Sequence, residues 1–277
     1  MTSAPQPLFR TADQAELSQI LDWAAAEGWN PGLADAEAFF ASDPKGFFVA
    51  EIDEQITAAI SLVNHCGELA FLGLYICLPQ FRSQGIGYGL WSHALGHAGE
   101  RVIGLDGVPA QEANYAKSGF KRLGASRRFA GQLDAAPQPG LRIFQDSDLA
   151  RLMQLDKAAI GFERPGFLTA WTKPSETRLT VVTEALDGFA TIRRCREGTK
   201  IGPIIAPDLE TGLALARAAS AQLPSEITFI DVAPNSPLAG VLEAHGFTET
   251  FATARMYRGA PPQAGPSLLS IATMELG

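Results

Sequence analysis

Residues 70–96 join a short apolar run to a glycine-rich turn and then to a helical stretch. The run AFLGLYICL has the length and composition of a buried strand, and PQFRSQGIG follows it directly. Arg82 and the alternating Gly85, Gly87 and Gly89 stand in or next to this turn. Glycines let a backbone approach a ligand closely, and the first turn of a helix presents unpaired N–H groups at its positive dipole end. The turn therefore predicts either a phosphate-binding site or a closely packed helix start, and the glycines alone leave both open.

The segments around this turn alternate between helical and strand-like patterns. Apolar positions at helical spacing predict helices, and shorter apolar runs between turn residues predict strands. The predicted helices span 12–27, 33–42, 89–100 and 109–118, and the predicted strands span 47–52, 56–65, 68–78, 101–107 and 121–133. This order of helices and strands predicts an α/β or α+β domain.

The carboxyl-terminal part of the chain repeats this pattern. Residues 131–140 have the composition of a linker, and the stretch LRIFQDSDLARLMQLDKAA after it resembles LFRTADQAELSQILDWAAA near the start. Gly246 and Phe247 echo Gly119 and Phe120, which stand 127 positions earlier. We interpret the pattern as an internal duplication of about 130 residues, the alternative being a chance likeness of two α/β halves.

The length and charge of the chain limit the classes of protein to consider. Its 277 residues suit two domains, which we predict at 1–135 and 136–277. A net charge of −8 argues against a general nucleic-acid binder, and the apolar runs are too short to span a membrane. The polar start lacks the pattern of a signal peptide, and three cysteines without CxxC spacing are typical of reduced thiols. We therefore expect a cytoplasmic protein that binds neither nucleic acid nor membranes.

Two motifs give the amino-terminal half a family resemblance. The stretch PQFRSQGIG at 79–87 resembles motif A of the GNAT superfamily of N-acetyltransferases, which is usually written Arg/Gln-x-x-Gly-x-Gly/Ala. The stretch YAKSGF at 115–120 resembles the Tyr-x-x-x-Gly-Phe segment that follows it in the family. The whole chain resembles tandem-GNAT proteins with a diverged second half. This resemblance implies two tandem domains, each a mixed, mostly antiparallel sheet flanked by helices.

The resemblance also implies a cofactor and its binding residues. The cofactor would be acetyl-coenzyme A, used as a co-substrate without any metal. Its pyrophosphate would lie on backbone N–H groups of the turn, and its pantetheine arm would pair with exposed strand backbone where two neighbouring strands separate. The implied cofactor-binding residues are Tyr75, Cys77, Arg82, Gln84, Gly85, Ile86, Gly87, Tyr88 and Gly89.

The implied reaction is direct attack of a primary amine of a small molecule on the thioester carbonyl. Tyr115 would be the general acid that protonates the leaving thiolate. Tyr115 also fits a core aromatic on a short helix, and motif A would also persist in a non-catalytic acyl-coenzyme A binding or sensing protein of the same fold. Turnover distinguishes the enzyme from the sensor.

The general base and the acceptor contacts are less defined. Some family members carry a glutamate base where this chain has Phe71, so Glu68 and His65, at the start of the same strand, are the fallback candidates. Trp29 and Asn30 lie in the break between the first two helices, a segment that often covers the acceptor site in GNAT proteins. They are candidate substrate contacts, and a capped helix end with a buried tryptophan is the alternative.

The second copy lacks the residues of the first copy that predict phosphate binding and proton donation. In its segment PDLETGLA at 207–214 a single glycine remains, and Glu210 stands near the position of the arginine, where it would repel a phosphate. Leu242 occupies the position of the tyrosine. We expect the second domain not to bind acetyl-coenzyme A productively and to form part of the acceptor pocket. Charged or polar candidates for that wall, which would otherwise be solvated, are Glu163, Arg164, Arg193, Arg194, Cys195, Arg255 and Arg258.

Overall fold

The computed structural model describes residues 6–277, in which the same order of elements occurs twice. The first half contains β1 (Leu8–Thr11), α1 (Gln14–Ala26), α2 (Asp35–Ser42), β2 (Phe47–Ile52), β3 (Gln55–Asn64), β4 (Leu69–Cys77), α3 (Ile86–Ala98), β5 (Val102–Gly107), α4 (Glu112–Lys117) and β6 (Lys121–Gly131). The second half contains β7 (Leu141–Ile143), α5 (Leu149–Ile160), α6 (Pro165–Thr172), β8 (Arg178–Thr183), β9 (Phe189–Arg194), β10 (Thr199–Ile205), α7 (Leu209–Gln222), β11 (Thr228–Val232), α8 (Leu238–Ala244), β12 (Thr248–Arg258) and the additional β13 (Leu268–Ser270). The order predicted for a tandem chain is confirmed.

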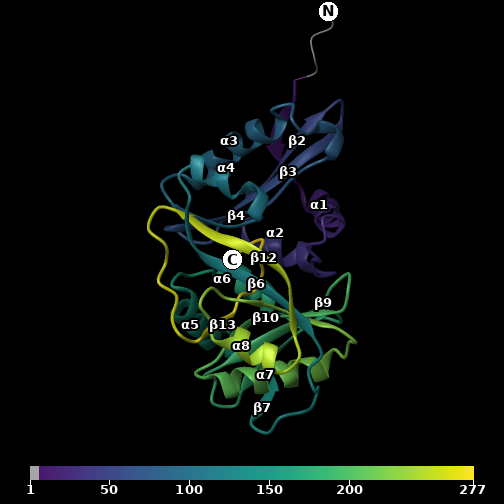
Figure 1. Ribbon diagram of the computed structural model, residues 1–277. Helices are drawn as coiled ribbons and strands as arrows, with labels where there is room; N and C mark the ends of the chain where they lie inside the picture. Colours follow the sequence, from purple (N-terminus) through teal and green to yellow (C-terminus); the bar gives the residue numbers. More distant parts are fainter. Residues whose placement is uncertain (1–5) are drawn as a thin grey trace, which may run out of the picture.

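All thirteen strands form one sheet, in the order β1-β2-β3-β4-β5-β12-β6-β11-β13-β10-β9-β8-β7. Only β4–β5 and β10–β11 are parallel, so the sheet is mixed and mostly antiparallel, as predicted. The two halves exchange their last strands. β12 pairs with β5 of the first half, and β6 pairs with β11 of the second half. Figure 1 shows the first half above the second, with yellow β12 crossing beside β6 at the boundary.

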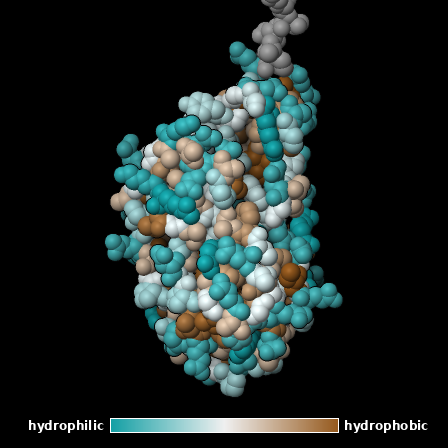
Figure 2. Space-filling model, viewed as in Figure 1, coloured by the Kyte–Doolittle hydropathy of each residue, from teal (hydrophilic) through white to brown (hydrophobic). Residues whose placement is uncertain are grey.

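Local sequence explains why the predicted helices form. Asp13 caps α1 by accepting a hydrogen bond from the N–H of Glu16 at 2.8 Å, and the Glu16 carboxylate accepts from the N–H of Asp13 at 2.9 Å. This reciprocal pair satisfies two amides that the helix itself leaves unpaired. Leu17, Ile20 and Leu21 then recur at helical spacing and are buried against the sheet side of the core. On the face in Figure 2, hydrophilic residues predominate and hydrophobic ones form small separate patches.

The first half opens a groove between its two parallel strands. β4 and β5 pair only from Leu69 with Val102 to Leu72 with Leu105. Beyond Leu72 a β-bulge places Leu74 and an adjacent residue opposite a single residue of β3, and Leu74 takes a positive φ of 47°. A bulge of this kind bends the strand away from its neighbour. The strands therefore separate at the end that leads into the glycine turn.

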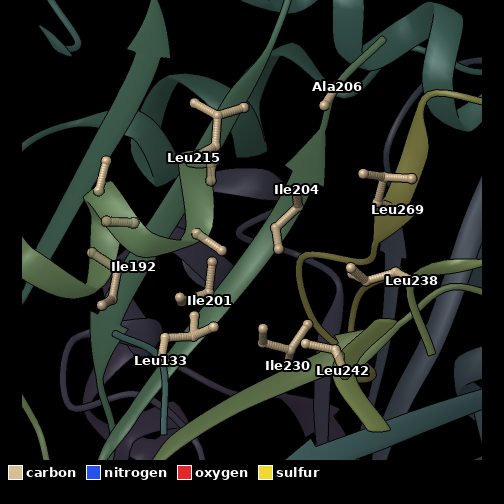
Figure 3. Close-up of a cluster of buried hydrophobic side chains, with 14 of the residues drawn as sticks. Leu133, Ile192, Ile201, Ile204, Ala206, Leu215, Ile230, Leu238, Leu242 and Leu269 are labelled. Carbon is tan, nitrogen blue, oxygen red and sulfur yellow. The ribbon is translucent and has the colours of Figure 1, made fainter. Parts of the chain in front are cut away.

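The second half begins the same groove and then fills it. β10 and β11 pair only at 199–201 with 228–230. β13 lies in the gap beyond, where Ser270 pairs with both Ile204 of β10 and Val232 of β11. Figure 3 shows Leu269 beside Ile204 in the apolar core that α7 and α8 cover. The gap that is open in the first half is closed by the chain's own strand in the second.

A buried network of charges joins the two halves. The Asp35 carboxylate of α2 accepts hydrogen bonds from Arg178 of β8 at 3.0 Å and Arg193 of β9 at 3.2 Å. The Trp171 ring lies against both guanidinium groups, 4.5 and 4.6 Å from its centroid. Burial alone would raise the pKa of Asp35, but the charges of Arg193 and Arg178 outweigh burial and lower it. The carboxylate stays ionised and compensates two buried cations.

A second part of this network holds the segment between α1 and α2. Arg128 of β6 binds the carboxylate of Asp231 at 2.7 and 2.9 Å and donates to the carbonyl oxygen of Trp29 at 2.7 Å. Lys200 lies 3.9 Å from the same carboxylate and donates to the carbonyl oxygen of Asn30 at 3.0 Å. The loop that carries Trp29 is therefore fixed by side chains of the second half and of the exchanged strand.

The network predicts a large effect of removing its shared anion. Asp35→Asn leaves Arg178 and Arg193 buried without a full counter-charge, which costs on the order of 3–5 kcal/mol for a buried pair that loses one partner. Urea unfolding measures this loss. Asp22→Asn, which removes an exposed partner of Arg196, is the matched control and changes stability by about 0.5 kcal/mol or less. Equal effects of the two changes would contradict a stabilising role of the network.

Candidate active site

One cleft of about 680 Å³ runs from the glycine turn to the strand exchange. Its first wall is the separated end of β4 and β5, its second is the turn before α3, and its third comes from β6, β12 and the carboxyl-terminal segment. The cleft has both polar and apolar lining residues and is open at the turn, as is typical of a site for a small-molecule ligand. Its walls come from both halves of the chain.

The glycine turn presents free backbone amides at the open end of the cleft. Gly85 caps α3 with a positive φ of 80°, and the first backbone bond of the helix runs from the N–H of Gly89 to the oxygen of Gly85 at 2.9 Å. The amides before Gly89 have no partner in the helix, as at any helix start. A Cβ on Gly87 would lie 2.8 Å from the hydroxyl of Tyr75, so only glycine leaves this space open.

The predicted cofactor residues have different surroundings in this turn. Arg82, Gly85, Gly87 and Tyr88 line the cleft. Gln84, Ile86 and Gly89 do not line it. The exposed Gln84 side chain donates to the carbonyl oxygen of Gln80 at 2.9 Å, the Ile86 side chain is buried in the core, and Gly89 packs on the ring of Phe9. Backbone contacts are the role predicted for these positions, and this role stays a prediction.

Arg82 makes contacts that hold the turn in place. Its Nε donates to the carbonyl oxygen of Cys77 at 2.8 Å, and its Nη2 donates to the carboxylate of Glu27 at 2.8 Å. Half of its side chain remains exposed, so it also places positive charge at the mouth of the cleft. Tyr75 and Cys77 line the cleft on the strand edge that β5 leaves unpaired. Partial burial raises the pKa of the Cys77 thiol, which remains neutral at neutral pH.

Tyr115 reaches the cleft from α4 and is held by aromatic packing. Its ring stacks on Trp91 with centroids 5.6 Å apart, and it is 7 % exposed. Gly107 lies directly beneath the ring, where a Cβ would collide with it. Burial and the neighbouring Tyr75 raise the pKa of Tyr115 to about 12. The hydroxyl is therefore a proton donor throughout the neutral range.

The far end of the cleft is built from residues that sequence reasoning did not identify. Strand exchange brings Phe251 and Thr253 of β12 beside Arg128 of β6, and the carboxyl-terminal segment adds Met274 and Glu275. No local pattern marks these positions, because their pairing partners lie more than a hundred residues away. The second half contributes its last strand and its tail to the lining of this cleft, and a role of these residues in an acceptor pocket stays a prediction.

Among the predicted acceptor contacts, only Trp29 lines the cleft. Asn30 exchanges two hydrogen bonds of 2.9 Å with the backbone of Glu197 and so joins the two halves. Glu68 lies in the exposed turn before β4, where it accepts from the thiol of Cys66. His65 is buried outside the cleft, 2.8 Å from the carbonyl oxygen of Leu276, and burial lowers its pKa to about 4.

The charged and polar candidates of the second half do not line the cleft either. Arg164 binds Asp156 through two bonds of 2.8 Å, and Arg193 belongs to the network around Asp35. The carbonyl oxygen of Arg194 accepts from the loop after Trp29, while Cys195 is buried. Arg255 does not line the cleft itself, but it binds the carboxylate of Asp106, which does.

Comparison with known proteins agrees with this architecture. The acetyltransferase (GNAT) family matches residues 15–120, and an acetyltransferase (GNAT) domain matches residues 152–268. Holothin acyltransferase of Pseudoalteromonas sp. (strain SANK 73390) is 32% identical over 277 residues, which cover 97% of this chain and 94% of that protein. The chain belongs to the GNAT family. It is an acyltransferase with two GNAT domains in tandem.

Solved structures of this GNAT protein's relatives show the same fold. A putative acetyltransferase from Pyrococcus horikoshii superposes with a TM-score of 0.82 at 16% identity, covering 100% of this chain and 99% of the other. A tandem GNAT protein from the clavulanic acid biosynthesis pathway gives a TM-score of 0.62 at 17% identity, covering 93% and 100%. In residues 6–277, no helix is long and apolar enough to cross a membrane. Within the same residues, no cluster of His, Cys, Asp and Glu has the composition and spacing to hold a metal ion.

The packing of Tyr115 on Gly107 gives a direct test of its position. Gly107→Ala would place a Cβ in the space that the Tyr115 ring occupies, so the ring must move away from Trp91. We expect the near-UV circular dichroism of the aromatic stack to weaken and acyl transfer to fall at least about tenfold, or about 1.4 kcal/mol of barrier. Gly96→Ala on α3, where a Cβ meets nothing within 4 Å, is the control. An unchanged spectrum and rate would contradict the assigned packing.

Proposed function

We propose that the protein is an acetyl-coenzyme A-dependent N-acetyltransferase that acylates the primary amine of a small molecule. The single observation that carries the proposal is one continuous cleft with three components. These are a bare helix start, a strand edge freed by a β-bulge, and a buried neutral tyrosine. Each component matches a chemical part of a thioester cofactor, and the cleft continues past them into a separate acceptor end.

The amino-terminal half has the groups that a coenzyme A diphosphate and pantetheine arm require. Free amides at the start of α3 and the half-exposed Arg82 favour a bound anion. Gly87 keeps the space beside Tyr75 open, so a ligand backbone can approach the turn. The edge of β4 from Gly73 to Cys77 has no β5 partner and can pair with amide groups of an extended arm.

The proposed reaction follows from where these groups lie. Bound acetyl-coenzyme A would supply an activated thioester carbonyl. The cleft holds the acceptor amine next to it, which replaces a bimolecular encounter by a positioned attack. Tyr115 keeps its proton at neutral pH, donates a hydrogen bond to the leaving sulfur, and acts as general acid as the C–S bond breaks.

The second half supports a single active site per chain. β13 fills the gap between β10 and β11, and a Cβ on Gly212 would collide with the side chain of Leu269. Asp208 caps α7 by accepting from the N–H of Thr211 at 2.8 Å, so a carboxylate already occupies that helix start. Leu242 is fully buried in the apolar core (Figure 3), where the first half has Tyr115. We infer that this half is structural and does not bind the cofactor.

Turnover tests the proposal directly. The protein is incubated with acetyl-coenzyme A and a panel of primary amines that includes holothin, the compound in the name of its relative, and release of free thiol is followed. Thiol release that depends on an added amine supports the proposal. Binding of acetyl-coenzyme A without turnover of any amine would instead indicate a sensing or binding protein.

Tyr115→Phe removes the proposed acid and keeps the ring. We expect acyl transfer to fall at least about tenfold, about 1.4 kcal/mol of barrier, with acetyl-coenzyme A affinity unchanged in calorimetry. Since the pKa of Tyr115 is raised to about 12, ionisation of this tyrosine should cause no loss of activity below about pH 11. Tyr257→Phe, at another buried tyrosine on β12, is the control and retains its rate within about twofold. Equal rates for Tyr115→Phe and the wild type would exclude the acid role.

A further inference from the structure

The carboxyl-terminal segment runs from the second half into the active cleft of the first. After β13 it passes beneath β4, where a Cβ on Gly73 would collide with the carbonyl oxygen of Glu275. The carbonyl oxygen of Leu276 accepts from Nε2 of His65 at 2.8 Å, and Gly277 packs against Phe71. Figure 1 places the end of the chain in the middle of the molecule. The segment is held next to the β-bulge, at the point where β4 and β5 separate.

Three carboxylates line the cleft, and two of them are bound by arginines. Glu27 accepts from Arg82 at the mouth. Asp106 accepts two bonds from Arg255, of 2.5 and 3.0 Å, and further bonds from hydroxyl groups. Glu275 is 5 % exposed, and among residues 6–277 no donor forms a hydrogen bond with its carboxylate. Its oxygens are not among the fully buried side-chain atoms without a partner, and their free acceptor positions can receive a donor from a molecule in the cleft that Glu275 lines.

The charges around Glu275 come from several elements. Burial alone would lower the pKa of Arg128 on β6, but Asp231 outweighs it and Glu275 adds to the rise. The same holds for Arg193 on β9, where Asp35 is the main counter-charge and Glu275 a further one. Arg128 binds Asp231 through two nitrogens, whereas Arg193 binds Asp35 through Nε alone and its two terminal nitrogens have no hydrogen-bond partner among residues 6–277. The remaining ionisable groups that line this part of the cleft are Asp106 on β5, bound by Arg255, and Tyr115 on α4.

We propose that Glu275 is the general base that removes the proton from the ammonium form of the acceptor. This inference rests on the proposed function. The N–H bond of the ammonium breaks and its proton goes to the Glu275 carboxylate, which frees the nitrogen lone pair. The lone pair forms the C–N bond to the thioester carbonyl, the C–S bond breaks, and the thiolate takes a proton from Tyr115. The nitrogen, now bonded to the acyl carbon, loses its second proton to solvent and becomes the neutral amide nitrogen. Glu275 releases its proton to solvent and solvent returns one to Tyr115, so the products are the amide, the free thiol and one proton.

The same residue defines the class of acceptor. A carboxylate that forms no ion pair with an arginine attracts a cation. The ring of Trp29 lines the same end of the cleft, as does the ring of Phe251, over which Arg128 already lies. Aromatic faces favour cationic groups as well as apolar carbon. The acceptor is therefore a primary amine that is protonated at neutral pH and carries an apolar or aromatic body, rather than an anionic compound.

Glu275→Gln tests the base in the full-length protein with acetyl-coenzyme A and the best amine of the panel. At about pH 7 we expect kcat/KM for the amine to fall about 100-fold, within the range for loss of a general base. Affinity for acetyl-coenzyme A should not change. At higher pH solvent supplies the free amine, so the ratio of wild type to variant should narrow to less than about tenfold. Glu226→Gln, at an exposed position outside the cleft, is the control and leaves the rate unchanged.

An acceptor that is already neutral separates catalysis from structure. With an alkoxyamine, which carries no ammonium proton at neutral pH, the loss in Glu275→Gln should be at least about tenfold smaller than with the ammonium acceptor. Glu275→Asp should recover part of the rate, because it keeps a carboxylate on the same segment. Equal losses with both acceptors, with no narrowing at high pH, would show a structural role.

The possible failures are distinguishable. If the wild type turns over no amine, the proposed function itself is contradicted. If the wild type is active and Glu275→Gln has an unchanged rate and pH profile, only the assignment of Glu275 as the general base is contradicted. A raised KM for the amine with unchanged kcat and pH profile would show that Glu275 binds the acceptor without taking its proton, and it would also overturn the proposal. Thermal unfolding and acetyl-coenzyme A binding establish that each variant is folded.

Discussion

The exchange of the last strands is the constraint on which the rest of the structure depends. β12 lies between β5 and β6, so the first half cannot complete its sheet without the second half. In this register Arg255 stands opposite Asp106 and binds its carboxylate inside the sheet. The strand also carries Phe251 and Thr253 into the cleft. This one strand pairing thus joins the halves, completes the sheet and forms the far end of the cleft.

The same groove has two outcomes in the two halves. In the first, the bulge at Leu74 and the cap at Gly85 leave strand edge and amides free. In the second, β13 supplies backbone partners, and Asp208 supplies the helix start with a carboxylate of its own. Buried polar backbone needs partners, and β13 supplies them in the second groove. The two halves therefore contain one open groove and one that the chain itself fills.

The sequence was informative wherever the determining pattern is local. The apolar spacing of α1 and the glycine turn predicted helices and strands that the structure contains, although β1 was not predicted and α3 begins earlier, at Ile86. The family motifs led to Tyr115 at the cleft. Asn30 does not line the cleft, because contacts with Glu197 and Lys200 of the second half orient the loop after α1. Glu68 does not line it either, because it lies in the exposed turn before β4.

The far end of the cleft could not be predicted for the same physical reason. Arg128 and Phe251 meet through pairing between strands far apart in the chain, and Glu275 reaches the cleft through a segment without periodic pattern. The small residue Gly73 is the one local sign of that contact, because a side chain there would exclude the tail. A glycine within an otherwise apolar strand indicates a close approach, but it does not say which segment approaches.

The stoichiometry of coenzyme A binding tests whether the first half alone holds an open cofactor groove. In a calorimetric titration of the full-length protein, the account predicts one molecule bound per chain, because the first groove is open and the second is occupied by residues 268–270. Two bound molecules per chain would show that the second half retains a site, and absence of binding would show that the glycine turn does not receive the cofactor. Either result would contradict the account.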